Sequence, residues 1–214
     1  MTKVISVDPE NPDIHAIRKA ATVIKKGGVV AYPTCSFYAL GVDSFKKKSI
    51  ERVYRLKQRD SKKPLLILIG DLKNLFPLVK EVPSSASRLI DKFWPGALTI
   101  VFEAAESLPS NLTGNTGKIG IRLDDHRVAT LLANISGTPI TGTSANISGR
   151  MGCVTIFQIF SQFGQGLDLI LEAGSLPGGN PSTIVDVTFD PPKVLREGMV
   201  DIARIKHVQK VSVI

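Results

Sequence analysis

Cysteine is scarce in this sequence, and its scarcity excludes a protein held together by several disulfide bonds. Cys35 and Cys153 are the two cysteines in 214 residues, whereas disulfide-rich secreted domains carry several pairs. The first residues, Met-Thr-Lys-Val, lack the apolar stretch of a secretion signal. We therefore expect a cytoplasmic protein whose stability comes from a hydrophobic core.

Long hydrophobic runs are also missing. The longest aliphatic run spans residues 65–69 and is bounded by Pro64 and Gly70. A run of this length is enough for a buried strand, but a membrane-spanning helix needs roughly 18 or more apolar residues. The sequence therefore predicts no membrane-spanning helix, and we expect no membrane partner.

Histidine is the third residue in short supply. His15, His126 and His207 are scattered, and none has a cysteine or carboxylate at the spacing of metal ligands. The sequence also contains no P-loop and no glycine-rich dinucleotide fingerprint. We expect no metal site and no tightly bound cofactor, and we interpret His126 as the start of a helix.

What the sequence does have is a substantial apolar content and an excess of positive charge. Hydrophobic residues make up 43%, and 27 Lys and Arg exceed 19 Asp and Glu, which gives a formal charge of +8. Such a basic excess favours an anionic partner, which could be a nucleotide, a nucleic acid or a membrane surface. Charge alone does not choose among these three.

Predicted helices and strands alternate along the chain, which indicates the α/β class. The apolar spacing predicts helices over residues 12–26, 49–57, 85–93, 126–135 and 155–163. Short apolar runs predict strands over residues 29–32, 65–69, 97–102, 119–123, 138–143, 168–171, 183–187 and 193–196, the last of which closes the chain. We expect one domain over residues 1–214, built on a twisted, open, mixed sheet with flanking helices.

The loop after the first of these strands carries small polar side chains. It reads Pro33-Thr34-Cys35-Ser36 and sits at the carboxyl end of a strand, where ligands collect in α/β proteins. Its hydroxyl groups could instead satisfy the backbone of a turn. Cys35 could be a nucleophile, but no histidine stands beside it in the sequence, so we favour a small loop thiol.

Two further segments could bind an anion. Residues 57–64 place four cations just before a buried strand, and Arg and Lys both bind phosphate. Residues 141–149, Thr-Gly-Thr-Ser-Ala-Asn-Ile-Ser-Gly, open from a strand into a loop of small residues that a ligand can approach closely. A solvated basic turn and an ordinary loop remain the alternatives for these segments.

Taken together, the segments resemble the YrdC-like family of threonylcarbamoyl-adenylate synthases, over roughly residues 12–200. The resemblance rests on motifs in one order along the chain: residues 32–41, Lys57-Gln58-Arg59 with 63–65, Trp94-Pro95-Gly96, Gly120-Ile121-Arg122, residues 144–149, residues 182–186 and Arg196-Glu197-Gly198. It implies a twisted α/β sheet fold with a basic central cavity. It also implies synthesis of L-threonylcarbamoyladenylate and pyrophosphate from L-threonine, bicarbonate or carbon dioxide, and ATP.

The same resemblance implies the catalytic residues, the residues that bind ATP and threonine, and the partners of the protein. The implied catalytic residues are Lys57, Arg59, Ser144 and Asn146. The implied ATP-binding residues are Arg59, Lys63, Lys118, Ser144, Gly152 and Arg196. The implied threonine-binding residues are Ser36, Leu68, Arg122, Gly142 and Ser182. ATP would enter as a substrate together with Mg²⁺, and tRNA and the proteins that modify it would be the downstream partners.

Three positions differ from the pattern of many family members. Cys35 stands where many have glutamate, Asp60 where many have proline, and Leu68 where many have histidine. The first loop resembles the YciO-like branch more closely. Two alternatives therefore stay open: a YciO-like relative with another acceptor, and a protein of this fold that binds tRNA or double-stranded RNA without this activity.

Overall fold

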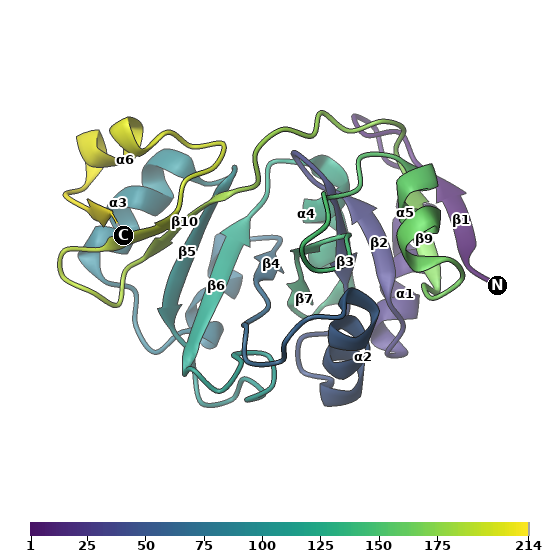
Figure 1. Cartoon of the computed structure of the whole chain (residues 1–214), viewed down its shortest axis with the longest axis horizontal. Coiled ribbons are helices and arrows are strands. Elements are labelled where there is room, and N and C mark those ends of the chain that lie inside the picture. The colour runs from purple at the N-terminus through teal and green to yellow at the C-terminus, as the bar shows by residue number, and fades with distance from the viewer. Residues whose placement is uncertain (214) are drawn as a thin grey trace.

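The computed structural model describes residues 1–213, which form six α-helices and twelve strands (Figure 1). The helices are α1 (Ile14–Lys25), α2 (Lys47–Lys57), α3 (Ser84–Phe93), α4 (Arg127–Ser136), α5 (Ile156–Phe163) and α6 (Ile202–Val208). The strands are β1 (Lys3–Ser6), β2 (Val30–Pro33), β3 (Tyr38–Gly41), β4 (Ile67–Ile69), β5 (Leu98–Glu103), β6 (Lys118–Leu123), β7 (Ile140–Thr141), β8 (Thr143–Ser144), β9 (Leu169–Glu172), β10 (Thr183–Asp186), β11 (Lys193–Arg196) and β12 (Ser212–Val213).

Hydrogen bonding groups the strands into two mixed sheets. The order in one is β1-β9-β2-β3-β8, and in the other β12-β11-β10-β5-β6-β4-β7. Figure 1 shows the first sheet toward the N-terminal end of the molecule and the second toward the C-terminal end. The predicted α/β class and mixed pairing are confirmed, with the strands divided between two sheets.

The two sheets meet where one short segment changes partners. β7 pairs with β4 of the second sheet, and β8 pairs with β3 of the first, with Gly142 alone between them. A Cβ atom on Gly142 would lie 2.5 Å from Leu68 Cγ, so no larger residue fits without displacing the buried Leu68 side chain. The strand predicted over residues 138–143 is therefore two short strands with a break at a required glycine.

Both faces of the central strands are covered, which explains why they read as continuous apolar runs. On β2, Ala31 packs into the larger hydrophobic cluster while Val30 and Tyr32 pack into a second cluster against α1 and α4. On β4, Ile67 packs into the larger cluster and Leu68 into the second cluster. A strand that is buried on both sides cannot alternate between polar and apolar residues.

The helix starts follow ordinary capping chemistry. Asp13 accepts a hydrogen bond from the backbone of His15 at the start of α1, and Thr155 does the same for Gln158 at the start of α5. His126 caps α4 by accepting from Val128 through its ring nitrogen, as predicted for a helix start.

The sequence missed four of these strands and α-helices. No element was predicted at β1 or β3. α6 and β12 were also not predicted, because the strand at residues 193–196 was expected to close the chain. These elements are short, and β12 in particular is a two-residue strand added to an edge, so local periodicity is too brief to reveal them. No helix within residues 1–213 combines the length and the apolar character required to span a bilayer.

Candidate active site

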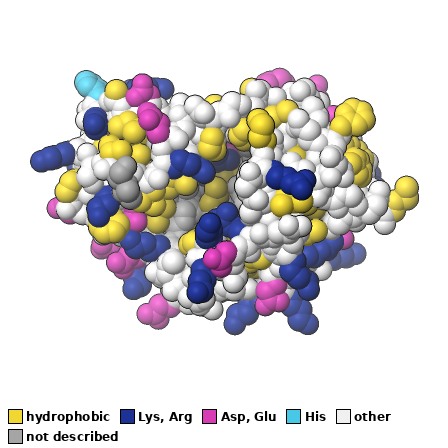
Figure 2. Space-filling view, viewed as in Figure 1, with side chains coloured by type: hydrophobic (Ala, Val, Ile, Leu, Met, Phe, Trp, Pro, Cys, Tyr) yellow, Lys and Arg dark blue, Asp and Glu magenta, His cyan; other side chains and the backbone are white. Residues whose placement is uncertain are grey.

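A cavity opens where the two sheets meet. It is lined by side chains from the first loop, β3, β6, the β7–β8 segment and the loop before β10, which are Thr34, Ser36, Phe37, Tyr38, Ala39, Arg59, Pro64, Leu66, Arg122, Gly142, Thr143, Ser144, Pro181, Ser182, Ile184 and Arg196. Figure 2 shows this face hollowed between the two halves of the molecule, with Lys and Arg side chains around the hollow. The segment after α2 and Arg196 on β11 also contribute, so six separate stretches of sequence converge on one site.

Two side pockets extend the cavity. One is lined in part by Gly152 and Asn146, and the other by Lys57, Lys63 and Asn146. Both share Ser144 and Arg196 with the central cavity, so the three spaces form one continuous cleft.

Three guanidinium groups give the cleft its charge. Arg59, Arg122 and Arg196 all line the central cavity, and no acidic side chain among the described residues lines it with them. Burial lowers the pKa of Arg196, and the nearby charges of Arg122 and Arg59 lower it further. Three positive charges that repel one another around a cavity favour the binding of a strongly anionic ligand.

Arg196 is held in place by the loop before β10. Its Nε and NH2 groups donate to the Ser182 backbone carbonyl at 3.1 and 2.8 Å, and NH2 also lies 3.3 Å from Ser182 Oγ. Ser182 Oγ lies 2.9 Å from Thr99 Oγ1 on β5. Because a guanidinium with fixed orientation loses less entropy on binding an anion, this anchoring favours the binding of phosphate or carboxylate.

Arg59 follows the C-terminus of α2 and curls over the turn that leads to β4. Its NH2 group donates to the Pro64 carbonyl at 3.0 Å, and Nε to the Lys63 carbonyl at 3.3 Å. Burial lowers the pKa of Arg59 as well. The turn thus presents Arg59 and Lys63 together to the same side pocket.

Lys57 is buried, with 2% of its surface exposed, and supports the loop after β8. Its Nζ donates to the backbone carbonyl of Ser144, and to Asn146 at 2.9 Å through the carbonyl and 3.2 Å through Oδ1. Ser144 Oγ donates to the same Oδ1 at 2.5 Å. Burial and the neighbouring charge of Arg59 lower the pKa of Lys57 to about 7. The lysine and the Ser-Ala-Asn loop, which lie far apart in sequence, therefore form one rigid unit.

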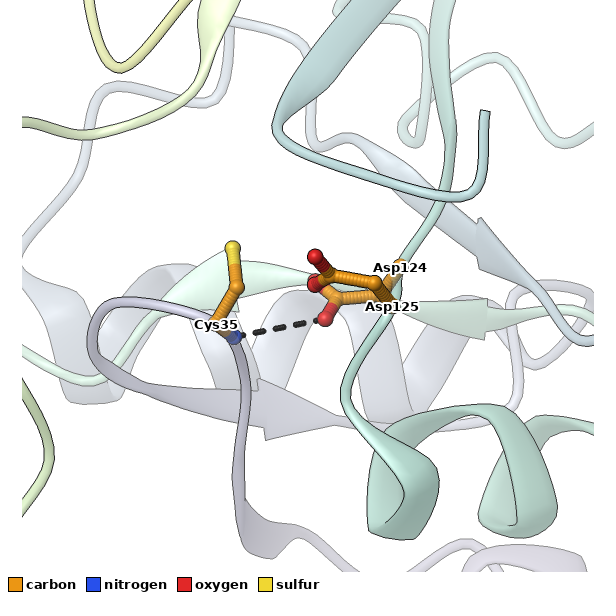
Figure 3. A group of neighbouring side chains, drawn as sticks. All are labelled: Cys35, Asp124 and Asp125. Carbon is orange, nitrogen blue, oxygen red and sulfur yellow. Dashed lines mark hydrogen bonds between the residues drawn. The ribbon is translucent and has the colours of Figure 1, made fainter. Parts of the chain in front are cut away.

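Cys35 lies beside the carboxylates of Asp124 and Asp125, as Figure 3 shows. Its sulfur and the carboxylate oxygens of Asp124 and Asp125 lie within 4.8 Å of one another. Burial, and then the charge of Asp124, raise the pKa of the Cys35 thiol to about 11. A protonated thiol is a poor nucleophile and a poor metal ligand, and Asp124 is already paired with Arg122. The absence of a metal site stays a prediction.

Most residues implied by the resemblance are brought together. Ser36, Arg122, Gly142 and Ser182 line the central cavity beside Arg59, Ser144 and Arg196, and the remaining members Lys57, Lys63, Asn146 and Gly152 line the side pockets. A ligand that spans these spaces could contact both the implied threonine set and the implied ATP set.

Leu68 and Lys118 are the exceptions. Leu68 has no exposed surface and packs in the second hydrophobic cluster, so it cannot contact a ligand as it stands. Leu66, two residues earlier, lines the cavity instead. Lys118 lies at the start of β6, where its Nζ is 3.0 Å from Asp186 Oδ2 and lies over the Phe189 ring. Its contact with ATP stays a prediction, and it does not line the cleft.

The sequence interpretation missed Asp124, Phe37 and Leu66. An aspartate directly after the strand that carries Arg122 is a usable signal, since a carboxylate placed there can pair with the arginine. Phe37 packs against Gly152, where a Cβ atom would lie 2.7 Å from its ring. No local pattern distinguishes Leu66 from Leu68.

Comparison with known proteins identifies the family. The model of the family named after Sua5, YciO and YrdC, described as telomere recombination, matches residues 22–198. The chain belongs to the Sua5–YciO–YrdC family. A threonylcarbamoyl-AMP synthase of the same family from Pyrococcus abyssi is 34% identical over 208 residues, which are 97% of this chain and 61% of the relative. The chain therefore spans less than two thirds of that protein.

Two solved structures of the Sua5–YciO–YrdC family superpose closely on this fold. Pyrococcus abyssi Sua5 complexed with L-threonine gives a TM-score of 0.96 at 33% identity, covering 100% of this chain and 63% of the Sua5 chain. Escherichia coli YciO gives a TM-score of 0.88 at 31% identity, covering 94% of this chain and 98% of the YciO chain. The fold is thus shared with both Sua5 and YciO.

Proposed function

We propose that this protein joins L-threonine, bicarbonate or carbon dioxide, and ATP to form L-threonylcarbamoyladenylate and pyrophosphate. The observation that carries the proposal is the convergence of Arg59, Arg122 and Arg196 on one cavity that has hydroxyl groups on its walls. The P. abyssi relative bears the name of this activity, and its Sua5 structure was solved with L-threonine.

The cleft suits a reaction between two anions. The threonine amine adds to carbon dioxide and loses a proton, or adds to bicarbonate with loss of water, to give a carbamate. A carbamate oxygen then attacks the α-phosphorus of ATP, the bond to the β-phosphate oxygen breaks, and pyrophosphate leaves with that electron pair. Positive charge and fixed orientation at the meeting point lower the barrier more than a strong base would. Arg122 is the candidate for the threonine carboxylate, since its guanidinium can form two parallel hydrogen bonds.

The nucleotide would occupy the side pockets. Arg59, Lys63 and Arg196 would meet the phosphates, with Ser144 and the backbone of Gly152 beside them. Lys57 and Asn146 would act by holding Ser144 in position, because the lysine donates its hydrogen bonds to that loop. ATP would enter with Mg²⁺ as a substrate and not as a resident cofactor.

The product would serve tRNA modification in the cytoplasm. A threonylcarbamoyl-adenylate is an activated acyl donor, and partner proteins would transfer its acyl group to an adenosine beside the anticodon. The chain's excess of positive charge is also compatible with direct contact to tRNA.

The decisive experiment measures pyrophosphate release from Mg-ATP in the presence of bicarbonate, with each amino acid supplied in turn. Release that requires both threonine and bicarbonate supports the proposal. Release that prefers another amino acid would favour a YciO-like relative with another acceptor, as the Cys35–Ser36 loop and the similarity to YciO allow. Salt-sensitive RNA binding with no release under any condition would favour the RNA-binding alternative.

A further inference from the structure

Arg122 forms a buried ion pair with Asp124, two residues further along the chain. The Arg122 NH2 group lies 2.6 Å from Asp124 Oδ2, and the two side chains expose 5% and 1% of their surface. Two buried charges lose their hydration, and only accurate geometry with further hydrogen bonds compensates for that loss. A contribution to stability therefore does not by itself explain why these two side chains are buried together.

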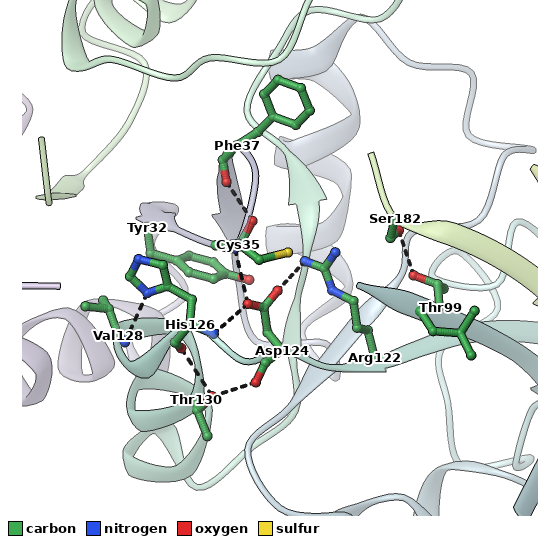
Figure 4. A network of polar contacts seen from close by, with 12 residues as sticks. Tyr32, Cys35, Phe37, Thr99, Arg122, Asp124, His126, Val128, Thr130 and Ser182 are labelled. Carbon is green, nitrogen blue, oxygen red and sulfur yellow. Dashed lines mark hydrogen bonds and ion pairs between the residues drawn. The ribbon is translucent and has the colours of Figure 1, made fainter. Parts of the chain in front are cut away.

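The second oxygen of Asp124 binds two backbone segments (Figure 4). Asp124 Oδ1 accepts hydrogen bonds from the backbone N–H of Cys35 at 3.3 Å and from that of His126 at 2.9 Å. One carboxylate thus joins the end of β6, the start of α4 and the first loop. That loop carries Ser36, which lines the cavity beside Arg122.

Arg122 keeps donors free for a ligand. Asp124 Oδ2 contacts its NH2 group as an ion pair at 2.6 Å. Neither that oxygen nor the buried Arg122 Nε has a hydrogen-bond partner among the described residues. A buried N–H group without a partner is uncommon, and it is expected where a ligand completes the hydrogen bonds. Asp124 therefore holds one corner of the guanidinium and leaves the rest available to the cavity.

We propose that Asp124 is a positioning residue for amino-acid binding: it fixes the Arg122 guanidinium toward the substrate carboxylate and holds the Ser36 loop against it. The inference rests on the proposed function, in which Arg122 meets that carboxylate. The sequence resemblance assigned no role to this position. Both walls of the amino-acid site depend on the same carboxylate, so its charge controls affinity for the amino acid and not for ATP.

Asp124→Asn is the direct test, because asparagine keeps the volume and the acceptor for the two backbone N–H groups while removing the charge. We expect the KM for threonine to rise at least tenfold, with kcat within about threefold and the Kd for ATP unchanged. Asp125→Asn is the matched control: it removes an exposed carboxylate one residue away and leaves both constants unchanged.

Moving the charge to the facing residue gives a test that a purely structural role would fail. Figure 4 shows the Cys35 side chain pointing toward the Arg122 guanidinium, and its sulfur lies within 4.8 Å of the Asp124 carboxylate. Cys35→Asp in the Asp124→Asn background restores a carboxylate beside Arg122. We expect the double variant to recover a threonine KM within about threefold of the wild type.

The Cys35 thiol supplies a readout that needs no turnover. The charged groups that act on it are Asp124 and Asp125, which raise its pKa, and Arg122, which lowers it. We expect Asp124→Asn to speed alkylation of Cys35 by iodoacetamide at pH 9, whereas Asp125→Asn has a smaller effect. Cys153 has no exposed surface, and Cys35→Ser gives the background rate.

The outcomes separate this inference from the function on which it rests. If the wild type uses threonine and Asp124→Asn leaves its KM unchanged, the inference is wrong and the function stands. Equal losses in threonine KM, ATP affinity and melting temperature, without recovery by Cys35→Asp, would also overturn it. If the wild type uses another amino acid, the same KM comparison is made with that substrate. Turnover independent of any amino acid would refute both.

Discussion

Lys57 donates hydrogen bonds to both the backbone carbonyl and the side-chain oxygen of Asn146, at 2.9 and 3.2 Å. The two residues are 89 positions apart in the sequence. Since Ser144 also donates to the Asn146 oxygen, the lysine fixes the polar loop that borders both side pockets. Its role in the cleft is therefore to hold other groups in place.

At pH 10, where the folded-state lysine is uncharged, Lys57→Met should destabilise the protein by roughly 2–3 kcal/mol, because it leaves buried carbonyl oxygens without their donor. It should also weaken ATP binding, since Ser144 loses its support. Urea unfolding and calorimetric titration with ATP measure the two effects. Lys47→Met, at the exposed N-terminal end of the same helix, should change neither. Equal behaviour of the two variants would contradict the assignment.

The low pKa of Lys57 predicts a dependence of stability on pH. The unfolded lysine titrates near 10.5 and the folded one near 7, so between these values the unfolded state binds more protons. The free energy of unfolding should therefore rise with pH across this window, by at most about 1.4 kcal/mol per pH unit, and level off below pH 7. Unfolding titrations at several pH values should show this slope, and it should be absent in Lys57→Met.

Arg59→Ala should weaken ATP binding by about 1.5–3 kcal/mol, the range of a hydrogen bond to a charged group. Arg59 lines both the central cavity and a side pocket. Lys62→Ala is the control, since Lys62 is an exposed cation in the same turn that does not line the cleft. An unchanged ATP affinity in Arg59→Ala by calorimetry would remove this residue from the nucleotide site.

Cys35→Ser should keep most of the activity. The reaction needs no covalent enzyme intermediate, and a thiol with a pKa of about 11 is almost entirely protonated at pH 7. Pyrophosphate release by the variant should stay within a few-fold of the wild type. Complete loss of release, with the fold and ATP binding intact, would mean that Cys35 takes part in the chemistry.

Leu66 should determine the preference for threonine over serine, because it lines the cavity where a methyl group could pack. One methyl group in such a pocket contributes about 1–3 kcal/mol, so Leu66→Ala should lower the preference by roughly tenfold. The ratio of kcat/KM for the two amino acids measures it. Leu68→Ala should instead lower stability by about 2–5 kcal/mol and leave the ratio unchanged. A changed ratio in Leu68→Ala would reverse this assignment.

Much of the fold could be predicted because burial leaves a local pattern. The apolar stripe of residues 12–26 and the run of residues 65–69 each matched an element, α1 and β4, within a few residues at either end. The missed elements differ in kind. β3 follows its partner β2 after a short turn, and β12 consists of two residues on a sheet edge, so their pairing depends on neighbours brought by the chain.

The same distinction between local pattern and spatial packing holds for the site. Residue types and their order within each motif follow from the sequence, and these were sufficient to indicate an anionic ligand and the family. The sequence could not indicate that Leu66 lines the cavity while Leu68 lies behind Gly142, because both are apolar and lie two residues apart in a region buried on both faces.

By itself, the sequence determined the α/β class, the basic character and the set of polar loops at strand ends, because these depend on neighbours along the chain. Only the tertiary structure decided that Lys57 holds Asn146, that Asp124 holds Arg122 and the Cys35 backbone, and that Lys118 pairs with Asp186 outside the cleft. The physical reason is that hydrogen bonds and ion pairs act over a few ångströms in space, whereas Cys35 and Asp124 are 89 residues apart along the chain.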